Sequence, residues 1–130
     1  MKVAYVDSSC LVAIAFDEPG ARQMARMLRS YDELFSSNLL EAELRSALRR
    51  EELDRSPDEL LDLVSWVYPR RPLSDEMAKI LAVSYLRGAD LWHLAVALAL
   101  ATTLTIDFLS LDIRQREASE LVGFRRLEWK

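Results

Sequence analysis

Two short apolar runs of the sequence each end in an aspartate, a residue type that binds metal ions and activates water. Residues 3–6 (VAYV) precede Asp7, and residues 108–111 (FLSL) precede Asp112. If both runs are strands of one parallel sheet, their carboxyl ends lie at the same edge, where open α/β folds build their sites. The pattern therefore predicts that these two aspartates lie near each other.

Two further acids fall on predicted helices. Glu43 shares a helical face with Leu39, Leu40 and Ala47, and a carboxylate on an apolar face carries a large desolvation cost unless a partner satisfies it. Glu43 is therefore a functional candidate. Asp90 begins a very apolar helix, where it is either a candidate ligand or an ordinary helix N-cap, and both interpretations stay open.

Convergence of these four acids would favour one kind of chemistry. Carboxylates packed close together raise one another's pKa and destabilise the fold, and a divalent cation removes that penalty. Oxygen donors without cysteine or paired histidine favour Mg²⁺ or Mn²⁺. Such an ion activates water and stabilises charge on the attacking and leaving oxygens, which suits phosphodiester hydrolysis.

The elements that would position these acids alternate along the chain, and this alternation predicts a parallel sheet with helices on both faces. Asn38 and Glu41 have the spacing of a capping box at the start of a helix. The predicted strands cover 3–6, 34–37, 105–111 and 124–129. The predicted helices cover 8–16, 19–30, 39–53, 57–68, 74–87, 90–101 and 113–122, with Gly88 and Gly123 as helix ends.

Composition excludes several classes of protein. The chain has 130 residues, 51% of them hydrophobic, which predicts a single globular domain over 1–130. One cysteine, Cys10, excludes an internal disulfide and favours the reducing cytoplasm, and one histidine excludes a histidine-rich metal site. The sequence predicts neither a signal peptide nor a membrane span. A net charge of −4 argues against a protein that coats nucleic acid non-specifically.

Four motifs in order resemble a PIN domain, and more narrowly the VapC-type toxins of toxin–antitoxin pairs. They are YVDSSCLV (5–12), SSNLLEAELRSALRR (36–50), RGADLWHLAVA (87–97) and FLSLD (108–112), the last followed by a helix that ends in VGF (122–124). The resemblance covers nearly the whole chain. It implies a three-layer α/β/α sandwich with a short, mainly parallel sheet of four to five strands, and an Mg²⁺- or Mn²⁺-dependent ribonuclease activity.

The resemblance also assigns the acids. The first acid of the family matches Asp7, the glutamate in its Glu-Leu-Arg-x-Ala context matches Glu43, and the acid three residues before His-Leu matches Asp90. The acid after the fourth strand matches Asp112, with Ser110 in place of the usual threonine. Asp107, in Thr-Ile-Asp, fits the same short pattern, but the distance from Asp112 to the Gly-Phe turn fits the family better.

Three residues are predicted to support the acids rather than to react. Ser9 matches the small hydroxyl residue after the first acid and can hydrogen-bond a ligating carboxylate, although a helix N-cap explains it as well. Ser110 keeps the hydroxyl of the threonine that it replaces. His93 lies one turn inside an apolar helix and is interpreted as a packed or supporting residue, not as a catalytic base.

The remaining predictions concern partners. Arginines lie on the segment that carries Glu43 and directly after Asp112, where they could hold RNA phosphates or simply form surface ion pairs. The resemblance implies a homodimer that is inhibited by a small VapB-type antitoxin. Apolar residues on 39–68 could face such a partner or belong to the domain's own core. They are Leu60, Leu61, Val64, Trp66 and Val67, and the arginines are Arg45, Arg49, Arg50, Arg114 and Arg116.

Two other kinds of function compete with this interpretation. A non-catalytic PIN-like module that binds protein or RNA is the alternative, and the retention of all four acids argues against it. A receiver-like or haloacid-phosphatase-like domain also uses aspartates at strand ends. It fits poorly, because Asp7-Ser8-Ser9 lacks the second acid that such sites require beside the first strand.

Overall fold

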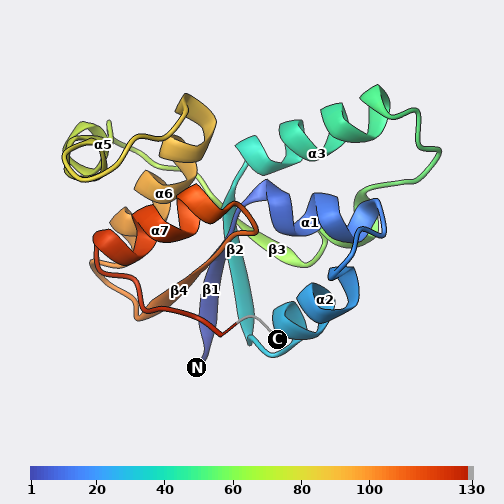
Figure 1. Ribbon diagram of the computed structural model, residues 1–130, viewed down its shortest axis with the longest axis horizontal. Coiled ribbons are helices and arrows are strands. Elements are labelled where there is room, and N and C mark those ends of the chain that lie inside the picture. Colours follow the sequence, from blue (N-terminus) through green and yellow to red (C-terminus); the bar gives the residue numbers. More distant parts are fainter. Residues whose placement is uncertain (129–130) are drawn as a thin grey trace.

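The computed structural model describes residues 1–128 and contains one parallel sheet flanked by helices (Figure 1). Within those residues the sheet has four strands in the order β3-β2-β1-β4, and every pairing is parallel. The predicted three-layer α/β/α class is therefore confirmed, with four strands. They are β1 (Val3–Val6), β2 (Glu33–Ser37), β3 (Val64–Val67) and β4 (Ile106–Leu109).

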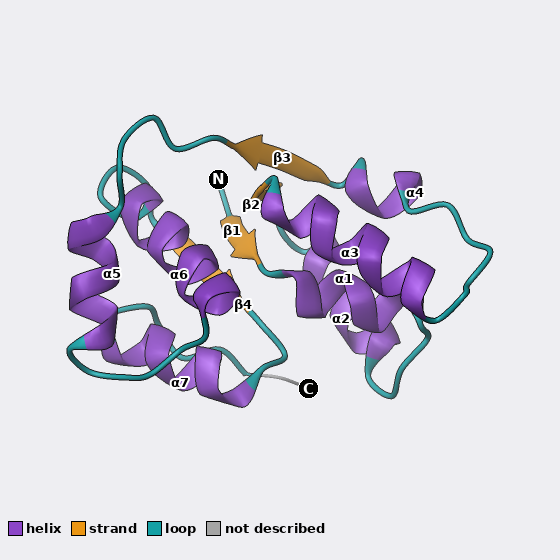
Figure 2. Ribbon diagram, turned by 90° about the horizontal axis from the view of Figure 1, so that it is seen from above, coloured by secondary structure: helices purple, strands orange, loops and turns teal. Residues whose placement is uncertain are grey.

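Helices cover both faces of the sheet, and the chain changes face after β3 (Figures 1 and 2). The first group packs on one face and consists of α1 (Ser8–Ala15), α2 (Ala21–Arg29), α3 (Leu39–Arg50) and α4 (Asp58–Leu61). The second group packs on the other and consists of α5 (Ser74–Leu81), α6 (Gly88–Leu100) and α7 (Ile113–Leu121). No helix of residues 1–128 is long and apolar enough to cross a membrane.

Alternation along the central strand β1 creates two cores. Ala4 and Val6 face the first group of helices, and Val3 and Tyr5 face the second. All four are buried, and Tyr5 is fully enclosed. Since burial of one large apolar side chain stabilises a fold by about 1.5–3 kcal/mol, these two cores hold β1 rigidly in place.

The segment from Pro57 to Tyr68 differs from its prediction as a single helix. Only the four residues of α4 are helical, and the chain then forms β3, which pairs with β2 from Leu34↔Val64 to Ser37↔Val67. The β-branched and aromatic residues of VSWV suit a pleated strand, and pairing with β2 satisfies their backbone groups. The apolar residues of this segment could have faced a partner protein or the domain's own core. Leu60, Leu61 and Val64 lie in the protein's own core.

The prediction of a last strand over 124–129 is also wrong as far as the structure describes it. Residues 124–128 are irregular, and Trp129 lies outside the described residues. This segment is held by side chains instead of by backbone pairing. Phe124 packs in the second core against Phe108, and the Arg125 guanidinium binds the Asp107 carboxylate through two hydrogen bonds of 2.6 and 2.7 Å.

Two helix ends also differ from their predictions. Gly88 does not end a helix but begins α6, because α5 already stops at Leu81. Asn38 makes no capping hydrogen bond with its side chain, and Glu41 pairs with Arg45 at 2.8 Å instead of completing a capping box. Gly123 follows α7 at φ 109°, the left-handed conformation expected of a glycine at a helix end.

Strand register sets the carboxyl edge of the sheet. Val6 lies opposite Leu109, so that Asp7 and Ser110 follow side by side, and the Asp7 N–H donates to the Leu109 carbonyl at 3.1 Å. From β1 the chain proceeds to β2 on one side and returns to β4 on the other. In open parallel sheets, ligands bind outside the carboxyl ends of the strands at the point where the strand order reverses. In this sheet that point lies between β1 and β4.

Candidate metal centre

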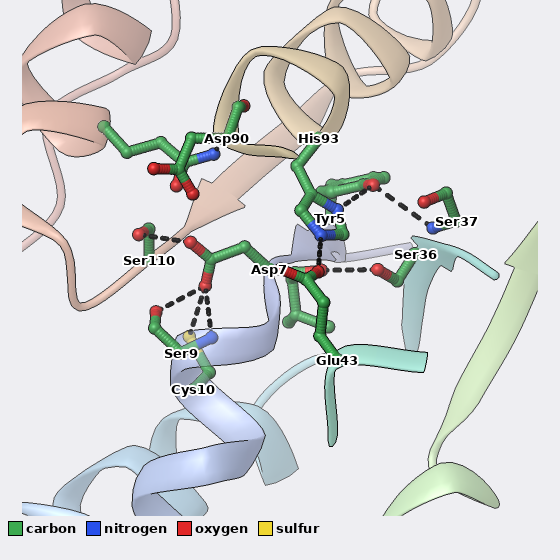
Figure 3. Close-up of polar contacts among 12 residues, drawn as sticks. Tyr5, Asp7, Ser9, Cys10, Ser36, Ser37, Glu43, Asp90, His93 and Ser110 are labelled. Atoms are coloured by element: carbon green, nitrogen blue, oxygen red, sulfur yellow. Dashed lines mark hydrogen bonds and ion pairs between the residues drawn. The ribbon is translucent and has the colours of Figure 1, made fainter. Parts of the chain in front are cut away.

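Asp7 is the first residue after β1 and the N-cap of α1. Its carboxylate is 3% exposed and accepts hydrogen bonds from the Ser9 backbone and hydroxyl, the Cys10 thiol and the Ser110 hydroxyl (Figure 3). Burial, with a smaller contribution from the charge of Asp90, raises the pKa of Asp7 to about 6 against the lowering effects of the two serine hydroxyls and of His93. The position thus holds a carboxylate whose negative charge is poorly stabilised.

Two serines clamp the two oxygens of Asp7. Ser9 donates to Oδ1 and Ser110 donates to Oδ2, each at 2.5 Å. The Ser9 hydroxyl also accepts from the Leu111 N–H at 2.9 Å, so that α1 is tied to the end of β4. The alternative interpretation of Ser9 as the N-cap of the first helix is wrong, because Asp7 is the N-cap of α1.

Asp112 and Asp90 start neighbouring helices. Asp112 is the exposed N-cap of α7, where its Oδ1 accepts from the Gln115 N–H at 2.9 Å. The buried Gln115 side chain donates to the Asp90 carbonyl at 2.9 Å and so joins the amino ends of α6 and α7. Asp90 makes no capping hydrogen bond, since Arg87 is the N-cap of α6, and the capping interpretation of Asp90 is wrong.

The carboxylates lie close enough to perturb one another. Burial raises the pKa of Asp90, and the charges of Asp112 and Glu43 raise it further. Glu43, on α3, is partly exposed, and its Oε1 lies 2.6 Å from Nε2 of the buried His93. The structure therefore brings all four predicted acids to one edge of the sheet, from β1, α3, α6 and α7.

Asp107 lies elsewhere. It is in the first half of β4, opposite Ala4, and its carboxylate accepts from Tyr31 and Arg125. These partners hold the pKa of Asp107 below its usual range against the opposing effect of burial. A carboxylate already neutralised by an arginine has a structural explanation, which favours Asp112 over Asp107 as the fourth acid.

The residues fit a hard divalent cation by chemistry but do not yet form a ligand group. Their donors are carboxylate oxygens. Burial, together with neighbouring negative charges, raises the pKa of Asp7 and of Asp90, and a cation would relieve this cost. Among residues 1–128, however, no three His, Cys, Asp or Glu side chains are arranged to hold a metal ion. Both oxygens of Asp7 and Oε1 of Glu43 instead form hydrogen bonds within the protein.

The raised pKa of Asp7 predicts an unusual dependence of stability on pH. In the metal-free protein, Asp7 keeps its proton up to about pH 6, whereas in the unfolded chain it loses it near pH 3.8. The folded state is therefore favoured below pH 4, and this contribution, on the order of 3 kcal/mol, is lost as pH rises through 6. Denaturant unfolding of wild type and Asp7→Asn between pH 4 and 7.5 measures it.

The difference between these two proteins isolates Asp7. Glu76 and Asp107, whose pKa values are lowered by their arginine partners, act in the opposite sense below pH 4 in both proteins. If the free energies of unfolding of wild type and Asp7→Asn differed by the same amount at every pH between 4 and 7.5, the prediction would be contradicted.

Two buried residues at this edge are not recognisable as site residues from their local sequence. Tyr5 precedes Asp7 by two positions and looks like any apolar strand residue, yet its hydroxyl lies 2.7 Å from His93 Nδ1. Burial raises the pKa of Tyr5 to about 12. Gln115 looks like a surface helix residue but is fully buried. The spacing of Gln115, three residues after the N-cap Asp112, is the one local feature that points to its place in the first turn of α7.

Comparison with known proteins agrees with this geometry. Residues 4–121 match the PIN domain family. No curated protein and no solved structure shows a significant match to the chain. PIN domains are generally metal-dependent nucleases that bind Mg²⁺ or Mn²⁺. Since the match covers most of the chain and includes all four acids, the chain belongs to the PIN domain family.

Proposed function

We propose that this protein is a metal-dependent endoribonuclease that hydrolyses RNA phosphodiester bonds, and that it is the toxin of a VapBC-type pair. The observation that carries the proposal is the gathering of four carboxylates, one of which is Asp7, a buried acid whose pKa is raised to about 6. Such a cluster costs stability, and perturbed acids of this kind concentrate at functional sites.

Asp7, Glu43, Asp90 and Asp112 would hold Mg²⁺ or Mn²⁺. A cation bound there would supply Lewis-acid chemistry for attack of water on a phosphodiester. Ser9 and Ser110 keep the Asp7 carboxylate in one orientation through hydrogen bonds to its two oxygens. His93 does the same for Glu43, and its buried position suits support better than proton transfer to a substrate.

Arginines near the acids would bind RNA phosphates. On α3, Arg45 and Arg50 already pair with Glu41 and Glu51. Arg49 is exposed on the same helix, and Arg114 follows Asp112 on the exposed start of α7. With a net charge of −4, RNA binding should weaken strongly with salt and depend on the metal. The antitoxin and the homodimer belong to this proposal through the resemblance to VapC-type toxins.

An RNA cleavage assay tests the proposal. Purified protein free of any antitoxin is incubated with total RNA in Mg²⁺, in Mn²⁺ and in EDTA. Discrete fragments are expected with either metal and none with EDTA, because carboxylates without a cation cannot stabilise the charge of the reacting phosphate. Fragments that persist in EDTA would contradict a metal-dependent mechanism.

A non-catalytic PIN-like module remains the second candidate, because no three acids of residues 1–128 are arranged as ligands. Titration calorimetry separates the two functions. Binding of Mn²⁺ by wild type that is lost in Asp7→Asn supports the nuclease, whereas a protein that binds RNA but neither Mn²⁺ nor Mg²⁺ supports the module.

A further inference from the structure

A buried chain of polar groups crosses the protein and ends at Glu43. It links Ser37 at the end of β2, Tyr5 on β1 and His93 on α6 to Glu43 on α3 (Figure 3). The distances along it are 3.1 Å from Ser37 N to the Tyr5 hydroxyl, 2.7 Å from that hydroxyl to His93 Nδ1, and 2.6 Å from His93 Nε2 to Glu43 Oε1.

When His93 is neutral, one arrangement of hydrogens satisfies every contact of this chain. The Glu43 carboxylate only accepts, so Nε2 of His93 carries a hydrogen. The Tyr5 oxygen accepts the Ser37 N–H, which leaves its own hydrogen to donate. With a neutral imidazole, that hydrogen goes to Nδ1. The Tyr5 hydroxyl thus selects the tautomer of His93 that presents a donor to Glu43.

Packing fixes the members of this chain. The Tyr5 ring stacks on Phe108, with ring centres 5.8 Å apart and an angle of 7° between the planes, and meets the His93 ring edge-on. Tyr5 and His93 are both 0% exposed, whereas the Glu43 side chain is 28% exposed. The rigid end of the chain therefore lies in the core, and the end that it holds lies at the site.

We propose that Tyr5 is a positioning residue, whose hydroxyl fixes the tautomer and ring orientation of His93 and, through His93, the orientation of the Glu43 carboxylate. The role of Glu43 as a ligand rests on the proposed function. Support of this kind for a metal-binding carboxylate is typically worth about 10–100-fold in metal affinity or activity.

The single histidine of the chain makes the first test direct. In tag-free, ¹⁵N-labelled protein, a long-range ¹H–¹⁵N spectrum contains one imidazole. Wild type is expected to show a protonated Nε2 and an unprotonated Nδ1. Tyr5→Phe is expected to lose this single tautomer, because Nδ1 has lost its donor. A wild-type ring with hydrogen on Nδ1, or an unchanged ring in Tyr5→Phe, would overturn the proposal.

A matched control separates positioning from simple destabilisation. Tyr31 is the second buried tyrosine whose hydroxyl binds a side chain, in this case Asp107 at 2.6 Å, away from the four acids. Tyr31→Phe removes the same atom, so it reports any general loss of stability. It should leave both the His93 spectrum and the affinity for Mn²⁺ unchanged, and Tyr5→Phe should weaken Mn²⁺ binding about 10-fold.

A double-mutant cycle decides whether Tyr5 acts through Glu43. Mn²⁺ affinity is measured by calorimetry for Tyr5→Phe, Glu43→Gln and the double variant. If Tyr5 acts through the carboxylate, Tyr5→Phe has no further effect in the Glu43→Gln background. Equal effects in both backgrounds would overturn the proposal. Neither readout needs RNA cleavage, so a protein with the expected tautomer and coupling that cuts no RNA would refute only the proposed nuclease function.

Discussion

Asp7→Asn is expected to lower the metal-dependent RNA cleavage rate about 10³-fold. The substitution removes the charge of the central carboxylate of the cluster, and the loss of several kcal/mol of charge stabilisation corresponds to a factor of this size. The asparagine carbonyl can still accept from the backbone and hydroxyl of Ser9, which are the partners of Oδ1. Initial rates on a defined RNA in Mn²⁺ measure the effect.

The same variant should be more stable than wild type when no metal is present. Its neutral amide avoids burying a charge at pH 7, which burial penalises in wild type. A higher Tm together with lost cleavage would show that the acid is kept for function at a cost in stability. Asp62→Asn, at an exposed position just after α4, serves as the control for loss of one negative charge. Cleavage by Asp7→Asn at the wild-type rate would refute the proposed site.

Asp112→Asn and Asp107→Asn are expected to have opposite effects. Asparagine caps a helix about as well as aspartate, so Asp112→Asn should keep α7 intact and change mainly the charge at the site. We expect cleavage to fall about 100-fold, equivalent to about 3 kcal/mol of charge stabilisation, with little change in Tm. Kinetics and differential scanning calorimetry on the same preparation check both parts.

Asp107→Asn should instead destabilise the fold and leave catalysis nearly unchanged. The substitution removes the charged partner of Arg125 and weakens the hydrogen bond from Tyr31. Because Arg125 is 63% exposed, we expect a loss of only about 2 kcal/mol, or roughly 5–10 °C in Tm. Lost cleavage by folded Asp107→Asn, with normal cleavage by Asp112→Asn, would exchange the roles assigned to the two residues.

Local patterns explain why much of the fold was predictable. The run VAYV before Asp7 consists of strand-forming residues, and the apolar segment after it has the length of a short helix, and β1 and α1 form there. Asp7 and Asp112 were placed at one sheet edge by a general property of parallel strands, not by any detail of packing. The catalytic assignment of the four acids stays a prediction, although the structure brings them together.

The errors lie where tertiary contacts outweigh local patterns. Residues 64–67 continue the apolar character of the preceding segment, yet they form a strand because the edge of β2 is there to pair with them. Residues 124–128 contain residue types that favour strands but are irregular, and the Arg125 side chain forms hydrogen bonds with the Asp107 carboxylate. The sequence of residues 64–67 does not reveal the unpaired edge of β2, and the sequence of residues 124–128 does not reveal the buried Asp107 carboxylate.

The sequence by itself determined the fold class and the family and predicted the four acids, because these depend on residue types, element order and motif order. Tertiary structure alone decided how the acids are held. Strand register places Ser110 beside Asp7, and contacts across 88 and 50 residues connect Tyr5 and Glu43 to His93. Such contacts follow from the order of strands and the packing of helices, which no local period encodes, and they decide which carboxylates are satisfied and which remain available for a cation.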